Sequence, residues 1–176
     1  MEFFSDMKKI TGFFTFGTAA FVLGFLDDLY QLSAKVRLAG QFLVGLGAYY
    51  FGFSFDTIGL FGAEFELPML VSLLGSVFWF MLVINAINLI DGMDGLAGGI
   101  VFIVMASMFI SAFYSGAVAL TVASAVLAGA LLGFLYYNFR PHNIFMGDGG
   151  AYFLGFAIAA LTLNASMKST AAVVLL

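Results

Sequence analysis

The sequence predicts an all-α protein, a polytopic bundle of about six to seven transmembrane helices with a small β-hairpin on one face. Two observations predict this class. Hydrophobic residues make up 63% of the 176 residues and charged residues only 9%, which is too little polar surface to cover a soluble core. The apolar residues also fall in long runs separated by short polar connectors. Residues 1–176 are therefore expected to form a single integral membrane domain in a lipid bilayer.

Six apolar runs are each about long enough to cross a ~30 Å hydrocarbon core. They lie at about 10–26, 38–53, 67–89, 97–113, 117–137 and 151–164, and a seventh begins at Ser169. The N-terminal run leads into two acidic residues rather than a cleavage site of small residues, so we do not interpret it as a signal peptide. No cysteine occurs, which excludes a disulfide framework and a thiolate metal site.

The polar connectors alternate between the two membrane faces. Connectors 27–37, 91–96 and 138–150 share one face, whereas 1–9, 54–66, 114–116 and 165–168 share the other. Five aspartates are thereby collected on one side of the membrane: Asp27, Asp28, Asp91, Asp94 and Asp148. Basic residues are equally numerous on both faces, so the charges alone do not orient the chain.

Residues 53–68 alternate apolar and polar side chains on either side of Gly59 and Gly62. This pattern is typical of a β-hairpin, which would lie on the face away from the aspartates, the non-catalytic face. An irregular interfacial loop held by phenylalanine side chains explains the same pattern, and both interpretations stay open.

A polar stripe begins inside the third apolar run. Its members recur at every third position: Asn85, Asn88, Asp91 and Asp94. On a helix this spacing keeps neighbouring members about 60° apart on one face, where they can converge on a ligand. Nearby glycines would let a phosphate approach closely. An ordinary Asp-Gly loop explains only part of this pattern, so we favour a site.

The first connector places Asp27 beside Asp28. Two adjacent carboxylates repel each other unless a cation lies near them, which indicates a divalent metal or a proton-accepting role. Lys35 and Arg37 follow at a distance that lets them turn back toward an anion, and Ser33 suits the N-cap of the next helix. A charged turn that marks the membrane boundary stays open as the alternative.

The third connector holds Asp148 between Gly147 and Gly149. Glycine on both sides permits a tight backbone whose free N–H groups open a helix, an arrangement suited to phosphate or a metal–phosphate pair. A simple N-cap is the alternative role for Asp148. His142 is the single histidine and is expected to pack at the interface rather than bind metal. Oxygen ligands alone indicate Mg²⁺ or Mn²⁺.

Carboxylates, a hard cation, basic residues and glycine-rich anion seats at a membrane surface together predict phosphoryl transfer on a lipid. A membrane proton or cation transporter that uses the one-sided carboxylates is the alternative. Acids at the ends of spans on one face favour surface chemistry over an ion pathway. A non-catalytic membrane scaffold is a further alternative, and the Asp-Gly-Ala-Arg pattern of CDP-alcohol phosphotransferases is not found.

Three motifs resemble the polyprenyl-phosphate N-acetylhexosamine-1-phosphate transferase family. They are the Asp27-Asp28 pair with Lys35, the run Asn-Leu-Ile-Asp-Gly-Met-Asp-Gly-Leu-Ala that starts at Asn88, and Asn138 followed by Ile-Phe-Met-Gly-Asp148. The sequence Leu-Ser-Ala-Lys-Val-Arg-Leu is most similar to the bacterial undecaprenyl-phosphate N-acetylglucosamine-1-phosphate transferases, whereas muramoyl-pentapeptide transferases look more distant. Family members are about twice as long, so the resemblance implies that this chain is a central fragment.

The resemblance implies a Mg²⁺-dependent reaction at the cytoplasmic face of the bacterial inner membrane. A UDP-linked N-acetylhexosamine, expected to be UDP-GlcNAc, would meet undecaprenyl phosphate and give a lipid-linked sugar diphosphate and UMP. This step would initiate a lipid-linked cell-envelope glycan, such as that of cell wall or lipopolysaccharide biogenesis. No nucleic acid partner is expected, and a homodimer stays open.

The resemblance also assigns roles to the polar residues. All five aspartates, 27, 28, 91, 94 and 148, would be catalytic. Asp27 would deprotonate or position the lipid phosphate, while Asp28 and Asp148 would hold the metal. The nucleotide sugar would be bound by Lys35, Asn88 and Asn138 together with the aspartate at 91, and the aspartate at 94 would support the site.

Overall fold

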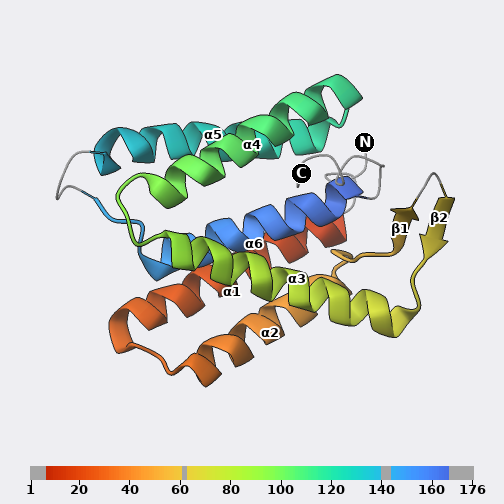
Figure 1. Cartoon of the computed structure of the whole chain (residues 1–176), viewed down its shortest axis with the longest axis horizontal. Coiled ribbons are helices and arrows are strands. Elements are labelled where there is room, and N and C mark those ends of the chain that lie inside the picture. The colour runs from red at the N-terminus through yellow and green to blue at the C-terminus, as the bar shows by residue number, and fades with distance from the viewer. Residues whose placement is uncertain (1–6, 61–62, 140–143, 167–176) are drawn as a thin grey trace.

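The computed structural model describes residues 7–60, 63–139 and 144–166 of the chain. Their elements follow in the order α1 (Met7–Tyr30), α2 (Ala34–Tyr50), β1 (Thr57–Leu60), β2 (Ala63–Glu66), α3 (Met69–Ile90), α4 (Leu96–Ser115), α5 (Val118–Asn138) and α6 (Gly147–Ser166). The described part is an all-α bundle with one added hairpin, which is the class that the composition predicted (Figure 1).

The expected number of six to seven spans is confirmed in part. Four helices, α1, α3, α4 and α5, are long and apolar enough to cross a membrane. The helix α2 has only 17 residues, and α6 does not join the four although it has 20. The predicted run from Ser169 lies outside the described residues.

Helix α6 is the centre of the bundle. It packs along α1 and α3, and α2 packs against the same two helices (Figure 1). Helices α4 and α5 form a hairpin whose first helix also contacts α3 and α6. Nearly every side chain from Ala151 to Leu163 is buried. Because its neighbours shield it, α6 needs fewer large apolar side chains than the outer helices.

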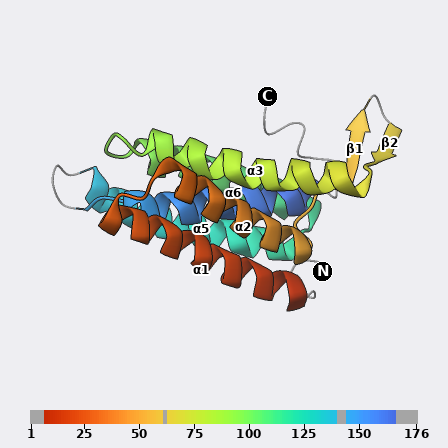
Figure 2. The same cartoon turned by 90° about the horizontal axis from the view of Figure 1, so that it is seen from below.

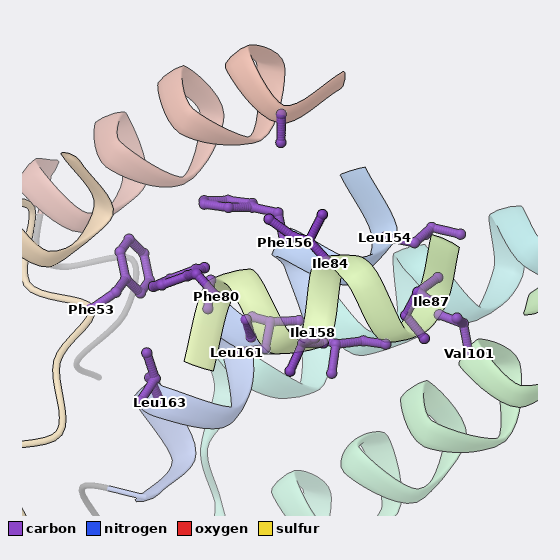
Figure 3. Packing of buried hydrophobic residues seen from close by; sticks show 14 of the residues in the cluster. Phe53, Phe80, Ile84, Ile87, Val101, Leu154, Phe156, Ile158, Leu161 and Leu163 are labelled. Carbon is purple, nitrogen blue, oxygen red and sulfur yellow. The ribbon is translucent and has the colours of Figure 1, made fainter. Parts of the chain in front are cut away.

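A stacked pair of aromatic rings and a glycine lie where α3 meets α6. The rings of Phe80 and Phe156 stack with centroids 5.2 Å apart, and Figure 3 shows them beside Ile84. One turn along, a Cβ at Gly155 would lie 2.6 Å from the Cα of Ile84. The two backbones therefore approach at a position where only glycine fits, as is common between membrane helices.

The predicted β-hairpin is present. Strands β1 and β2 pair antiparallel, with Thr57 opposite Glu66 and Leu60 opposite Ala63. Gly59 lies within β1 opposite Glu64, rather than in the turn. The hairpin lies at the end of the bundle away from the junction of α1 and α2 (Figure 2).

Helix α1 is longer than the apolar run predicted. It continues to Tyr30, so Asp27 and Asp28 belong to its last turns and the connector shrinks to residues 31–33. Gln31 ends the helix with a φ of 50°. The helix can extend beyond its apolar run because Asp28 is exposed, while the buried Asp27 accepts hydrogen bonds from other groups of the chain. Ser33 takes the N-cap position of α2, but its side chain makes no capping hydrogen bond.

The polar stripe of the sequence does not stay on one helix. Helix α3 ends at Ile90, and Asp91 is its C-cap. Asp94 therefore lies in the short turn before α4, where Gly95 adopts a φ of 76°. The prediction that one helical face presents all four polar residues is wrong, because the glycines after residue 91 end the helix.

Candidate active site

The acidic connectors meet at one end of the bundle. The C-terminal ends of α1, α3 and α5 lie there beside the N-terminal ends of α4 and α6 (Figure 1). Hydrogen bonds between Asp28 and the start of α6, and between α3 and Asp148, join the three regions directly. The expectation that these connectors come together is confirmed.

Asp28 binds the N-terminus of α6. Its carboxylate oxygens accept hydrogen bonds from the backbone N–H of Asp148 at 2.9 Å and of Gly149 at 3.1 Å. A Cβ at Gly147, which has a φ of 67°, would lie 2.9 Å from the same carboxylate. The N–H groups that the sequence predicted to be free for an anion are thus bound to an anion of the chain itself.

The side chain of Asp148 points to α3. Its Oδ1 accepts a hydrogen bond of 2.6 Å from the Nδ2 of Asn88. Asp91 follows Asn88 by three residues and is half-buried. Burial, together with the negative charges of Asp148, Asp28 and Asp94, raises the pKa of Asp91 to about 6. Accumulated negative charge of this kind is relieved when a cation binds among the carboxylates.

Asp27 has different surroundings from its neighbour. It is buried, and its Oδ2 accepts hydrogen bonds from the hydroxyl of Tyr152 at 3.0 Å and from Nη1 of Arg37 at 3.3 Å. Its Oδ1 accepts the backbone N–H of Leu32 at 2.9 Å. Asp27 therefore ties α1 to α2 and α6, whereas Asp28 is exposed.

Asn138 connects two loops. Its Oδ1 accepts the backbone N–H of Gly95 at 2.6 Å, and its Nδ2 donates to the carbonyl of Ile144 at 2.7 Å. Its side chain is buried, and Gly95 leaves no room for a Cβ because the ring of Phe139 lies against it. The carboxamide that the sequence predicted to bind substrate is thus engaged with the backbone on both sides.

Asn85, the first member of the predicted stripe, has its hydrogen-bond partners on α2 and within α3. It exchanges hydrogen bonds with Gln41 of α2, which is fully buried, and donates to the carbonyl of Met81. Asn85 therefore belongs to the packing of α2 on α3, and the prediction that it converges with Asp91 on a ligand is wrong.

The other predicted residues lie at the exposed rim of this end. Lys35 is exposed in the first turn of α2, and Asp94 is exposed in the turn before α4. Arg140 and His142 lie outside the described residues.

Sequence reasoning missed Tyr152 as a neighbour of the site. It stands in an apolar run and is almost fully buried, which made it look like an ordinary core residue. The available signal was its spacing, because a residue four positions after Asp148 lies on the same face of a helix.

Within the described residues, no group of three or more carboxylate or histidine side chains is arranged to hold a metal ion. Asp28 and Asp148, joined through the backbone of α6, are a pair rather than a cage. Mg²⁺ is commonly bound by one or two carboxylates, with water and substrate phosphates completing its octahedron. The donor set fits that kind of site.

Comparisons with known proteins identify the family of this chain. Residues 10–166 match the family described as Glycosyl transferase family 4. The chain is 43% identical over 150 residues to the "Probable undecaprenyl-phosphate N-acetylglucosaminyl 1-phosphate transferase" of Bacillus subtilis (strain 168). The aligned segment covers 84% of this chain and 42% of that relative. It is 38% identical over 162 residues to the phospho-N-acetylmuramoyl-pentapeptide-transferase of Thermoanaerobacter sp. (strain X514), with 85% and 50% covered.

A third relative is the phospho-N-acetylmuramoyl-pentapeptide-transferase of Clostridium acetobutylicum, which is 35% identical over 163 residues, or 86% of this chain and 50% of the relative. The chain thus spans about half the length of the curated relatives it matches. The family match extends from the first turn of α1 to the last residue of α6 and includes all the carboxylates at this end of the bundle. The chain therefore belongs to glycosyl transferase family 4.

Proposed function

We propose that this chain contains the catalytic end of a Mg²⁺-dependent transferase that moves N-acetylhexosamine-1-phosphate from a UDP-sugar to undecaprenyl phosphate. The sugar is N-acetylglucosamine, as the name of the Bacillus subtilis relative suggests. The observation that carries the proposal is the contact of Asp28 with the start of α6, which brings Asp28 and Asp148 together beside Asn88.

The reaction exchanges one phosphate for another. An oxygen of the lipid phosphate attacks the phosphorus that bears the sugar, and the bond from this phosphorus to the oxygen bridging the diphosphate breaks. UMP leaves with that oxygen, and the lipid keeps a sugar diphosphate. Little covalent chemistry falls to the protein in such transfers, so positioning and charge stabilisation are what the residues must supply.

Asp28 and Asp148 would hold the metal. When bound, Mg²⁺ would neutralise negative charge on the diphosphate and on the departing phosphate. Asn88 fixes Oδ1 of Asp148 by its hydrogen bond and leaves the second carboxylate oxygen for other partners. Asp91 lies close enough to feel the charge of both acids and would bind the nucleotide sugar together with Lys35. Asp94 would support the same rim.

Asp27 and Asn138 would act through their neighbours. Asp27 accepts hydrogen bonds from three other groups of the chain, so we assign it the orientation of Asp28 rather than contact with the lipid phosphate. Asn138 would hold the turn that carries Asp91 and Asp94, because it binds the N–H of Gly95.

The membrane setting is part of the proposal. We place this end of the bundle at the cytoplasmic face of a bacterial inner membrane, where a UDP-sugar and the head of a polyprenyl phosphate can meet. A transporter is less well supported, because Asp27 is the only fully buried acid among the described residues and it lies at the end of the bundle.

The test is release of UMP from UDP-N-acetylglucosamine by membranes supplied with undecaprenyl phosphate. Two proteins would be compared: this chain as it stands, and a chimaera in which residues 10–166 replace the matching segment of the Bacillus subtilis relative. We expect UMP release that requires Mg²⁺ and stops with a chelator. A panel of UDP-sugars would then identify the hexosamine.

A chimaera that inserts into membranes but releases no UMP from any UDP-sugar would refute the proposal. Activity of the chimaera without activity of the chain alone would show that the neighbouring segments of the relative are needed for turnover.

A further inference from the structure

Asp27 and Asp28 divide the contacts of α1 with α6 between them. The two side chains leave the helix about 100° apart. Asp28 binds backbone N–H groups at the N-terminus of α6, and Asp27 accepts the hydroxyl of Tyr152 one turn further along the same helix. The two aspartates therefore contact α6 at positions one helical turn apart.

The buried hydroxyl of Tyr152 donates its hydrogen bond to a carboxylate, that of Asp27, although an uncharged acceptor would also satisfy it. Its side chain is 1% exposed, and its hydroxyl lies 3.0 Å from Oδ2 of Asp27, which is 4% exposed. Arg37 donates to the same oxygen from α2. A phenylalanine would fill this position without any polar group to satisfy, so the hydroxyl is best explained by what it does for the carboxylate.

We infer that Tyr152 is a positioning residue of the active site, which acts on the reaction through Asp27. This inference rests on the proposed transferase function. Its hydroxyl and Arg37 fix Oδ2 of Asp27 inside the bundle, and this contact holds the last turns of α1 in register with α6. That register places the carboxylate of Asp28 on the N–H groups of Asp148 and Gly149.

Close packing makes this register sensitive to one hydrogen bond. A Cβ at Gly24, one turn before Asp28, would overlap the backbone carbonyl of Asp148. The two helices therefore touch through backbone atoms beside the proposed metal ligands, and a small rotation of α1 would displace Asp28 from α6.

The experiment is to replace Tyr152 by phenylalanine, which removes only the hydroxyl. Tyr49→Phe, at the opposite end of the bundle on α2, is the matched control. Both are made in the chimaera described above, and kcat and the KM of each substrate are measured per folded molecule. We expect Tyr152→Phe to lower kcat about tenfold or more, with both KM values within about twofold of wild type. Tyr49→Phe should match wild type.

A wild-type kcat per folded molecule in Tyr152→Phe would overturn the inference. If the yield and the melting temperature fall while kcat stays unchanged, Tyr152 only supports packing.

A second measurement does not depend on turnover. The melting temperatures in detergent of Tyr152→Phe, Asp27→Asn and the double variant form a cycle. Non-additive shifts in melting temperature would support the inference that the two side chains act as a unit. Additive shifts would refute it. Absence of UMP release by the wild-type chimaera would refute the transferase proposal instead, and the cycle would still decide whether Tyr152 holds Asp27.

Discussion

Asp28 caps α6 across 120 positions of sequence, with the N–H of Asp148 donating to its Oδ1 at 2.9 Å. The first helix of the chain thereby completes the N-terminus of the last described one. Because an N-terminus carries partial positive charge, the carboxylate is stabilised there while its lone pairs remain partly exposed. A structural contact and a metal ligand can thus be the same side chain.

Replacing Asp28 with asparagine should weaken this cap. A carboxamide offers one acceptor oxygen and no charge, so one of the two N–H groups of α6 loses its partner. We expect a loss of stability of roughly 1 kcal/mol, the usual cost of removing an N-cap acceptor, and a loss of turnover. Melting temperature in detergent micelles measures the first effect. The control is Asp94→Asn, an exposed acid whose replacement should leave the melting temperature unchanged.

The sequence was sufficient to predict that Asp28, Asp91 and Asp148 gather at one end, because alternate crossings of a bilayer leave little choice. It was not sufficient to predict which of two adjacent acids faces inward. That choice depends on Tyr152, which lies in an apolar run of the sequence. Only the packing of α6 against α1 shows that its hydroxyl donates to Asp27. Likewise, Asn85 looks like part of the site until Gln41 is found opposite it on α2.

Replacing Gly24 with alanine should separate α1 from α6. The added methyl group would overlap the carbonyl of Asp148, and backbone atoms cannot turn aside as a flexible side chain can. Overpacking of this kind costs about 1–3 kcal/mol. Turnover should fall with it, because Asp28 moves away from the start of α6.

The matched control for that change is Gly129→Ala in α5, where nothing lies within 4 Å of the new Cβ. Its melting temperature should stay the same or rise slightly, since alanine favours a helix more than glycine does. Equal behaviour of the two alanine variants would contradict the close approach of α1 and α6.

Replacing Asn138 with alanine separates two interpretations of this residue. If Asn138 mainly holds the loops, the buried N–H of Gly95 and the carbonyl of Ile144 lose their partner, at a cost of roughly 1–3 kcal/mol in stability. Leu132→Ala, at an exposed position of the same helix, should cost little. An unchanged melting temperature with a raised KM for the UDP-sugar would instead support the direct substrate contact that the family resemblance implies.

Replacing Asp148 with asparagine should lower turnover by about a hundredfold or more, without loss of membrane insertion. The new carboxamide can still accept the hydrogen bond from Asn88, so the fold is preserved while the charge is lost. Release of UMP against Mg²⁺ concentration is the measurement, with Asp56→Asn beside the distant hairpin as the control. Wild-type turnover and Mg²⁺ dependence in Asp148→Asn would count against its role as a metal ligand.

The amide pair of Gln41 and Asn85 should behave as a structural unit of α2 and α3. Removing one partner leaves a buried amide unsatisfied, whereas replacing both with leucine removes the polar groups together. Each single leucine variant should therefore lower the melting temperature more than the double variant does, with a coupling free energy of about 0.5–2 kcal/mol. Turnover per folded molecule should survive in the double variant, because Asn85 exchanges hydrogen bonds with Gln41 and not with the carboxylates. If turnover disappears while the melting temperature is kept, Asn85 belongs to the site after all.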